Sequence, residues 1–174
     1  MNIKLAFAGK MGSGKDTAVK YLINNYKGKK FSFAEPIYDI LYYSQKICGF
    51  PIEKDRKFLQ MVGSDWAREK DVNVWINILL NKTNNNSHNY YISDLRFDTE
   101  FEALRKNGWI CIKIINKNTE INREGTGKKN HISETSLDII DDCEWDYIIE
   151  NNDTIENFYK KLDLIYIGVI NKKT

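Results

Sequence analysis

The residues with the clearest capacity for chemistry are a glycine-rich stretch that ends in a lysine, at positions 9–15. It reads Gly-Lys-Met-Gly-Ser-Gly-Lys and matches the pattern G-x-x-x-x-G-K of a phosphate-binding loop. Glycines let the backbone wrap closely around an anion, so that N–H groups and the positive end of the following helix face the phosphates. The lysine adds a mobile positive charge for the β and γ phosphates. The predicted phosphate-binding residues are Gly9, Gly12, Ser13, Gly14, Lys15, Asp16 and Thr17.

Asp16 departs from the standard pattern, because it stands where a serine or threonine normally holds Mg²⁺. A carboxylate is a hard oxygen ligand, so Asp16 can reach the ion directly or through water, and Thr17 can contact the α phosphate. The alternative is that Asp16 only favours the N-terminus of the helix electrostatically. Both interpretations of Asp16 stay open at the level of the sequence.

A second set of charged residues follows farther along the chain, where an acceptor phosphate would need cations from outside the loop. Arg96 lies just beyond a predicted strand, at the carboxyl edge where open parallel sheets bind ligands. Asp94, at the same edge, is placed to orient Mg²⁺ through water or to fix an arginine. Arg68 is the other candidate cation. The alternatives are a local ion pair between Asp94 and Arg96 that caps the next helix, and a solvated helix position for Arg68.

A basic segment without apolar periodicity, residues 116–130, precedes His131. It can close over the donor and bring Arg123 or Lys128 to the transferring phosphoryl while excluding water. A plain surface loop is the alternative. Because the second pKa of a phosphate acceptor is about 6, the acceptor is already ionised and needs no general base. His131 is therefore expected to be structural or to anchor this segment.

Strand-like and helix-like segments alternate around these residues. Apolar runs predict strands near residues 3–8, 30–33, 90–93, 109–115 and 146–149. Apolar spacing predicts helices near residues 15–26, 36–44 and 100–106, in a mostly helical section over 53–83, and after 155. The last helix is expected to bury a stripe made of Ile155, Phe158, Leu162, Ile165 and Val169. This alternation predicts a mostly parallel five-stranded sheet with helices on both faces.

Composition narrows the class of protein further. The chain has 174 residues, a formal net charge of +2 and 42% hydrophobic residues, which describe one globular domain. Three cysteines without a CxxC pair argue against a disulfide framework or a structural zinc site and suit a reducing cytoplasm. No apolar run approaches the roughly 18 to 20 residues of a membrane span. The charge is too balanced for a protein that binds nucleic-acid polymers.

Six sequence blocks in a fixed order make the chain resemble the deoxynucleoside monophosphate kinases of bacteriophages and large DNA viruses. The blocks are GKMGSGKDT at 9–17, SFAEP at 32–36, LQMVGSDWAR at 59–68, ISDLRF at 92–97, HISETSLD at 131–138 and IIENNDTIENF at 148–158. They span nearly the whole chain. One departure is Asp98-Thr99-Glu100, where relatives often have a proline and an asparagine, so the start of the following helix is in doubt.

The resemblance implies an α/β P-loop kinase of one domain, with an acceptor-binding helical region at about 36–83 and a lid at about 116–134. It implies ATP and Mg²⁺ as cofactors and a deoxynucleoside monophosphate of the dTMP, dGMP or dCMP type as substrate. A homodimer in the cytoplasm, the host cytoplasm for a viral protein, goes with it. The resemblance implies roles for Lys15 and Arg96 in catalysis and for Asp94 in the magnesium environment. With Arg123 from the basic segment, the predicted catalytic residues are Lys15, Asp94, Arg96 and Arg123, and with the Asp16 carboxylate the predicted metal residues are Asp16 and Asp94. The implied acceptor-binding residues are Phe33, Glu35, Gln60, Arg68 and Arg96.

Four other classes of protein share parts of this pattern. The animal type of phosphomevalonate kinase has a similar GKD loop and S-D-x-R segment, whereas the aromatic residues here suit a nucleobase better. Dephospho-coenzyme A kinase has the same architecture, but its D-x-P-L segment is missing. A switch GTPase would need an aspartate where Thr119 stands. A nucleotide-binding module without turnover is disfavoured by the presence of Lys15, Asp94 and Arg96 together.

Overall fold

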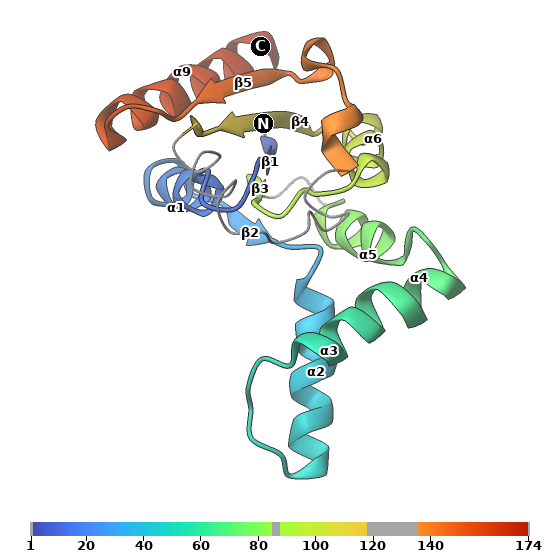
Figure 1. Ribbon diagram of the computed structural model, residues 1–174. Coiled ribbons are helices and arrows are strands. Elements are labelled where there is room, and N and C mark those ends of the chain that lie inside the picture. Colours follow the sequence, from blue (N-terminus) through green and yellow to red (C-terminus); the bar gives the residue numbers. More distant parts are fainter. Residues whose placement is uncertain (1, 85–87, 118–135, 174) are drawn as a thin grey trace. The chain divides into compact units, whose positions relative to one another are not determined.

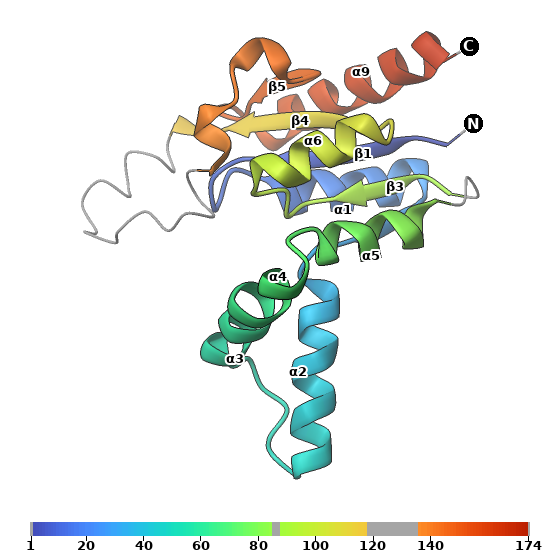
Figure 2. The same cartoon turned by 90° about the vertical axis from the view of Figure 1, so that its right-hand side faces the viewer.

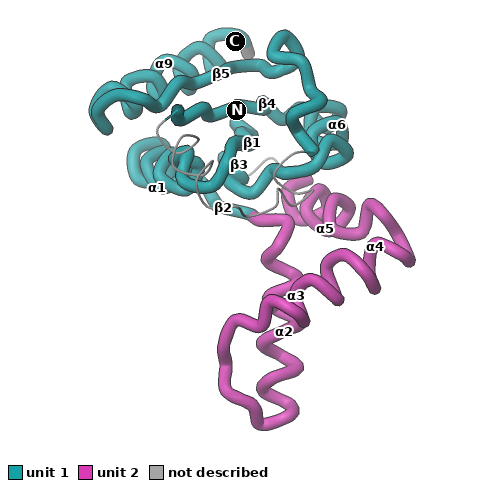
Figure 3. Tube along the Cα trace, viewed as in Figure 1, with its two compact units in different colours: residues 1–31, 85–174 teal, residues 32–84 magenta. Residues whose placement is uncertain are grey.

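The computed structural model describes residues 2–84, 88–117 and 136–173. The chain divides into two compact units, one made of residues 1–31 and 85–174 and the other of residues 32–84 (Figure 3). We call them unit 1 and unit 2. The helical region predicted at about 36–83 lies in unit 2, and the assignment of the chain to a single domain stays a prediction.

Unit 1 is built on a five-stranded parallel sheet (Figure 1). Its strands are β1 (Lys4–Ala8), β2 (Lys29–Phe31), β3 (Tyr90–Ile92), β4 (Ile110–Ile115) and β5 (Tyr147–Glu150). Their order is β2-β3-β1-β4-β5, and every neighbouring pair is parallel. The predicted sheet is therefore confirmed. Because β1 is central and buried, the loop that follows it emerges from the middle of the carboxyl edge.

Helices cover both faces of this sheet (Figures 1 and 2). Helices α1 (Lys15–Tyr26) and α9 (Ile155–Lys173) lie on one face, and α6 (Asp98–Lys106) lies on the other. Two short 3₁₀ turns, η2 (Ser136–Ile139) and η3 (Asp142–Glu144), precede β5. The apolar core under α1 and α9 includes Leu5, Phe7, Leu22, Ile112, Phe158, Leu162, Ile165 and Val169.

The predicted apolar stripe on α9 is wrong at one residue, Ile155. Ile155 is 43% exposed, whereas Phe158 and Leu162 are buried. Ile155 is the first residue of the helix, and burial along the stripe begins only at Phe158. Helical periodicity predicts the direction of a side chain, but it does not predict where along the helix the neighbouring elements start to cover it.

Polar and aromatic contacts fasten α9 to α1. The Asp163 carboxylate accepts hydrogen bonds from the hydroxyls of Tyr21, at 2.9 Å, and Tyr26, at 2.7 Å. Tyr26 also stacks on Tyr166 with ring centroids 3.7 Å apart. Burial and the neighbouring carboxylate raise the pKa of Tyr26 above its ordinary value, so its hydroxyl remains a donor. The helix that carries the phosphate loop is thus held by a polar network as well as by apolar packing.

Unit 2 is helical. It consists of α2 (Glu35–Cys48), α3 (Arg56–Gln60), the π-helical segment η1 (Met61–Trp66), α4 (Ala67–Lys70) and α5 (Val74–Thr83). Pro36 lies in the first turn of α2, and Gly49 ends that helix with a φ of 69° in the left-handed region. The helical middle section is confirmed, with a break between α4 and α5. Across residues 2–84, 88–117 and 136–173, no helix combines the length and apolar character that a membrane crossing needs.

Candidate functional site

The phosphate loop of unit 1 depends on its glycines for its shape. Gly9, Gly12 and Gly14 have φ values of 140°, 84° and 110°, which residues with a side chain rarely adopt. At Gly9, a Cβ atom would also overlap the backbone carbonyl oxygen of Ile114 in β4. The loop therefore lies directly against the sheet, and α1 begins immediately after it, at Lys15. This is the strand–loop–helix arrangement that presents backbone N–H groups to an anion.

Lys15 is held over the loop that it follows. Its ammonium donates hydrogen bonds to the carbonyl oxygens of Gly9, at 2.5 Å, and Lys10, at 2.8 Å. Ser13 lies in the same loop and is buried, and its hydroxyl has no hydrogen-bond partner among the described residues. A positive charge and a buried polar atom are thus present within one short loop, which is the chemistry that a phosphate group needs.

Asp16 joins the first turn of α1 to the carboxyl edge of the sheet. Its Oδ1 atom accepts a hydrogen bond from the Lys30 ammonium at 2.7 Å and from the Ser93 hydroxyl at 2.7 Å. The Lys30 hydrogen bond is the largest effect and holds the pKa of Asp16 below its usual value; partial burial opposes it, and the Ser93 hydrogen bond lowers the pKa further. The side chain is nevertheless 79% exposed. Asp16 is therefore an ionised carboxylate that is hydrogen-bonded to Ser93, the residue that follows β3 and precedes Asp94 in the chain.

These oxygen donors fit Mg²⁺. Asp16 is exposed and ionised, and Asp94 is half-buried directly after Ser93. No group of three or more acidic, histidine or cysteine side chains suited to a metal ion occurs in the described residues. Mg²⁺ usually takes one or two carboxylates and fills its remaining positions with water and phosphate oxygens. Asp16 and Asp94 are the residues that would hold the ion.

Arg96 is carried by a backbone turn that Glu100 fixes. The buried Glu100 carboxylate accepts hydrogen bonds from the backbone N–H groups of Arg96, at 3.0 Å, and Phe97, at 3.2 Å. Helix α6 then begins at Asp98, with Glu100 in its first turn. Arg96 itself is exposed. Sequence reasoning missed the role of Glu100, although a carboxylate three residues into a helix is a recognisable capping signal.

Asn151 is a second residue that sequence reasoning missed. It follows β5 directly, and its side-chain amide donates a hydrogen bond to the Ser13 carbonyl oxygen at 2.9 Å. A Cβ atom on Gly14 would lie 2.7 Å from the same amide nitrogen. Asn151 therefore supports the phosphate loop from the neighbouring part of the sheet edge. The order of the strands, which the sequence does not state, brings it there.

The predicted acceptor-binding residues other than Arg96 all lie in unit 2. Phe33 is buried, and Glu35 begins α2 and forms an ion pair with Lys82 of α5 at 3.5 Å. Gln60 is the exposed last residue of α3, and Arg68 is half-buried in α4. Gln60 and Arg68 therefore flank η1. Their assignment to the acceptor stays a prediction.

The π-helical turn η1 is packed closely on its neighbours in unit 2. A Cβ atom on Gly63 would lie 2.9 Å from the Cδ1 atom of Ile37, so glycine permits α2 to approach. The buried indole N–H of Trp75 donates to the Gly63 carbonyl oxygen at 2.9 Å. Trp75 is therefore a packing residue rather than a surface for a nucleobase, whereas Trp66 in the same segment is 57% exposed. Single turns of π-helix often mark functional sites.

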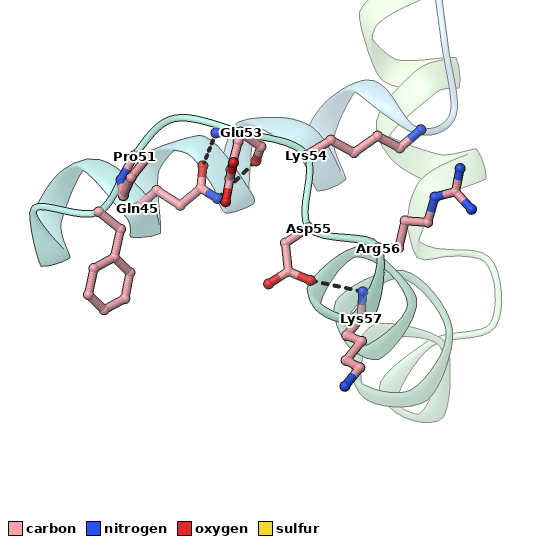
Figure 4. Close-up of a pocket in the computed structure, with 8 residues that line it drawn as sticks. Gln45, Pro51, Glu53, Lys54, Asp55, Arg56 and Lys57 are labelled. Carbon is pink, nitrogen blue, oxygen red and sulfur yellow. Dashed lines mark hydrogen bonds between the residues drawn. The ribbon is translucent and has the colours of Figure 1, made fainter.

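Unit 2 also contains a hollow of about 440 Å³, lined by Gln45, Phe50, Pro51 and residues 53–57 (Figure 4). Gln45 exchanges two hydrogen bonds with the backbone of Glu53 and holds the loop after α2 in place. Asp55 turns toward the backbone N–H of Lys57, at 2.9 Å, and starts α3. None of the predicted acceptor-binding residues lines this hollow. We therefore do not assign it to the acceptor.

Unit 1 has a hollow of about 560 Å³ along the exposed side of α1, lined by Asp16, Val19, Lys20, Ile23, Asn24 and Lys30. It includes the Asp16–Lys30 pair but none of the glycines of the phosphate loop. Arg123, Lys128 and His131 lie outside the described residues, as does most of the predicted lid, and their roles stay predictions.

The architecture is that of a P-loop kinase. Shikimate kinase from Aquifex aeolicus is similar over 97% of this chain and 98% of its own, with a TM-score of 0.57 and 17% identity. Dephospho-CoA kinase from Campylobacter jejuni is similar over 100% of both chains, with a TM-score of 0.56 and 16% identity. At these identities the likeness concerns the fold alone. It confirms the predicted fold class.

The sequence matches a family model described as deoxynucleotide monophosphate kinase, over residues 4–74 and 54–162. This chain belongs to the deoxynucleotide monophosphate kinase family, a family of phosphotransferases, and the resemblance inferred from its motifs is confirmed.

Two viral proteins are similar to this chain. One, from Acanthamoeba polyphaga mimivirus, carries a provisional assignment as a deoxynucleotide monophosphate kinase. It is 28% identical over 92% of this chain and 94% of its own. The uncharacterized protein ORF77 of Ictalurid herpesvirus 1 (strain Auburn) is 39% identical over 80% of this chain. The match spans only 60% of that herpesvirus protein.

Proposed function

We propose that this protein transfers the γ-phosphoryl group of Mg-ATP to a deoxynucleoside 5′-monophosphate and releases ADP and the deoxynucleoside diphosphate. The observation that carries the proposal is the phosphate loop. Its three left-handed glycines and the Lys15 ammonium lie beside Asp16 and the end of β3, in a chain whose family phosphorylates deoxynucleotides. A phosphate-binding loop and a metal-holding edge are what such a transfer needs on the donor side.

On the donor side, the residues act by binding and by charge. Backbone N–H groups of the loop and the N-terminus of α1 hold the phosphates of ATP, and Lys15 neutralises charge on the transferring group. Asp16 and Asp94 hold the metal, directly or through water. When bound, Mg²⁺ supplies further neutralisation of the phosphate oxygens. Thr17, exposed in the first turn of α1, is proposed to contact the α phosphate.

On the acceptor side, Arg96 and Arg68 bind the monophosphate, because a guanidinium can grip two phosphate oxygens at once. Phe33, Glu35 and Gln60 line the acceptor site. An oxygen of the acceptor phosphate attacks the γ-phosphorus, the bond from that phosphorus to the β–γ bridging oxygen breaks, and ADP leaves with the bond electrons. The attacking oxygen is already ionised, so no general base is required.

The experiment is a measurement of ADP production from Mg-ATP with a panel of acceptors. The panel contains the four common deoxynucleoside monophosphates, the ribonucleotides, phosphomevalonate and dephospho-coenzyme A. We expect turnover with one or more deoxynucleoside monophosphates of the dTMP, dGMP or dCMP type. Turnover with phosphomevalonate alone would overturn the substrate class, and silence across the panel would favour a binding module without catalysis.

A homodimer in the cytoplasm, the host cytoplasm for a viral protein, completes the proposal. Apolar side chains on the outer side of α9, Leu164 at 72% and Ile167 at 50% exposure, offer a surface that a second copy would cover. All three cysteines are free, which suits a reducing compartment. Sedimentation equilibrium of the native chain tests the dimer, and a mass of 20.4 kDa at all concentrations would exclude it.

A further inference from the structure

The orientation of the Asp16 carboxylate is set by two residues outside the phosphate-loop motif. The Lys30 ammonium and the Ser93 hydroxyl each lie 2.7 Å from the same atom, Oδ1. Two donors on one oxygen fix the plane of the carboxylate. Within the described residues, the other oxygen, Oδ2, accepts no hydrogen bond, and the side chain is largely exposed. One oxygen is thus used for positioning, and the other is presented to a ligand.

The sheet brings these groups together. Strands β2 and β3 are parallel neighbours, with Lys30 in register with Tyr91. Ser93 follows the last residue of β3, and α1 starts beyond the adjacent strand β1. Because all of these elements belong to unit 1, the arrangement follows from the sheet itself.

Lys30 and Lys15 have different tasks in this arrangement. Lys15 donates to the carbonyl oxygens of Gly9 and Lys10, within the loop. In the part of the chain that the structure describes, Lys30 contacts no acidic group besides Asp16. Its side chain is about half exposed, at 46%. An ordinary exposed ion pair of this kind would contribute little to stability. The contact between Lys30 and Asp16 is better explained by a role in orienting the Asp16 carboxylate.

We propose that Lys30 and Ser93 are positioning residues for Asp16, and that they hold Oδ1 so that Oδ2 faces the metal of the bound nucleotide. The inference rests on the proposed nucleotide binding at this loop. Carboxylates that ligate metals are themselves held by hydrogen bonds, and loss of such a partner typically lowers metal affinity. The inference also decides between the two interpretations of Asp16, since a residue that served only the helix N-terminus would need neither partner.

The test compares the affinity of the native chain and its variants for a fluorescent ADP analogue, mant-ADP, in Mg²⁺ and in EDTA. The dissociation constant in EDTA divided by the dissociation constant in Mg²⁺ measures how strongly the metal supports binding. Ser93→Ala leaves every charge in place and is expected to lower this ratio about tenfold. Lys30→Met is expected to lower it by a similar factor, whereas Lys30→Arg, which keeps a donor for Oδ1, restores it. Lys29→Met, one residue earlier in β2, is the matched control and should leave the ratio unchanged.

The Asp16→Asn background shows whether these residues act through Asp16. In that background Ser93→Ala and Lys30→Met should no longer change the ratio, because the oriented ligand is gone. Equal losses in both backgrounds would mean that Lys30 or Ser93 acts on the nucleotide itself. An unchanged ratio in both single variants would reduce the contact to a surface ion pair, and a ratio that rises in Lys30→Met would mean competition with the metal. Each of these results overturns the proposal.

Separate controls test whether the variants fold and whether the proposed function holds. Because Ser93 is buried, circular dichroism must show that the Ser93→Ala variant is folded. Lys30 is about half exposed, so the Lys30 variants carry the test if Ser93→Ala does not fold. A chain that shows the metal coupling but transfers no phosphoryl to deoxynucleotides refutes the proposed function alone. A chain that binds no mant-ADP at all refutes both.

Discussion

Unit 1 and unit 2 hold their predicted site residues in different ways. In unit 1, side chains from β2 and from just beyond β3 and β5 hold the phosphate loop and the first turn of α1. Ser93 and Lys30 hold Asp16, and Asn151 holds the Ser13 carbonyl. In unit 2, Gln60 is exposed and Glu35 meets one exposed lysine.

From this difference we expect unit 1 to bind the donor and unit 2 to contribute to recognition of the acceptor. A site that is held by many internal contacts is ready to bind before the ligand arrives, which lowers the cost of binding. The proposed donor, ATP, is the same in every turnover, so a preformed site suits it. The acceptor residues proposed in unit 2 meet a nucleotide whose base can vary, and we expect substitutions there to change which base is used rather than whether phosphoryl transfer occurs.

The largest effect on turnover is expected from substitution of Lys15, in the donor site proposed in unit 1. Lys15→Ala removes the mobile charge of the donor site and should lower kcat by at least about 100-fold. The melting temperature should hardly change, because the side chain is not buried in the core. Steady-state ADP production measures the effect, and Lys20→Ala, an exposed lysine on the same helix, is the control. A Lys15→Ala variant with near-native turnover would contradict the donor assignment.

The two arginines proposed to bind the acceptor allow a comparison of the units, because Arg96 belongs to unit 1 and Arg68 to unit 2. Arg96→Ala and Arg68→Ala should each raise KM for the deoxynucleotide about 10- to 100-fold, since each loses a hydrogen bond between charged groups. KM for ATP should stay the same. Arg105→Ala, an exposed arginine on α6, serves as the control. Unchanged acceptor kinetics in either variant would remove that arginine from the acceptor site.

Asn151 sharpens the account of unit 1. Asn151→Ala removes the hydrogen bond to the Ser13 carbonyl and should weaken ADP binding roughly 5- to 10-fold, while KM for the acceptor is unaffected. Fluorescence titration with mant-ADP measures it, with Asn157→Ala on the exposed first turn of α9 as the control. An ADP affinity equal to that of the native chain would show that the loop keeps its shape without this support.

Trp75 offers the corresponding test in unit 2. Trp75→Phe removes the hydrogen bond to the Gly63 carbonyl and should cost about 1 kcal/mol of unfolding free energy. Because η1 lies between Gln60 and Arg68, KM for the acceptor should rise, and nucleotide affinity should not change. Urea unfolding and acceptor kinetics check this. The exposed Trp66→Phe controls for loss of an indole, and equal destabilisation by both variants would argue against the hydrogen bond.

The smallest effect concerns the thiols and leaves activity intact. Burial raises the pKa of Cys111 in β4 to about 12, whereas Cys48 in unit 2 and Cys143 in unit 1 are exposed. At pH 8 a thiol reagent should therefore modify two cysteines in the folded protein, because only an accessible thiolate reacts. The third should react after unfolding in denaturant. Rapid modification of all three would show that unit 1 opens readily.

The sequence predicted the phosphate loop and the strand–helix alternation well, because both depend on short-range spacing. Gly9 and Lys15 are recognisable from their pattern, and buried strands are recognisable from apolar runs. The contacts of Lys30 with Asp16 and of Asn151 with Ser13 could not be predicted, because they depend on strand order. The π-helical turn η1 also escaped prediction, since apolar spacing does not distinguish it from an α-helical turn.

The central claim is that a phosphoryl group moves from ATP at the loop of unit 1 to a deoxynucleoside monophosphate. The most direct measurement follows the label from ATP carrying ³²P at its γ position into separated reaction products. The account predicts labelled deoxynucleoside diphosphate, formed by the native chain and lost with Lys15→Ala. Label that appears only in inorganic phosphate, or that stays in ATP with every deoxynucleotide supplied, would contradict it.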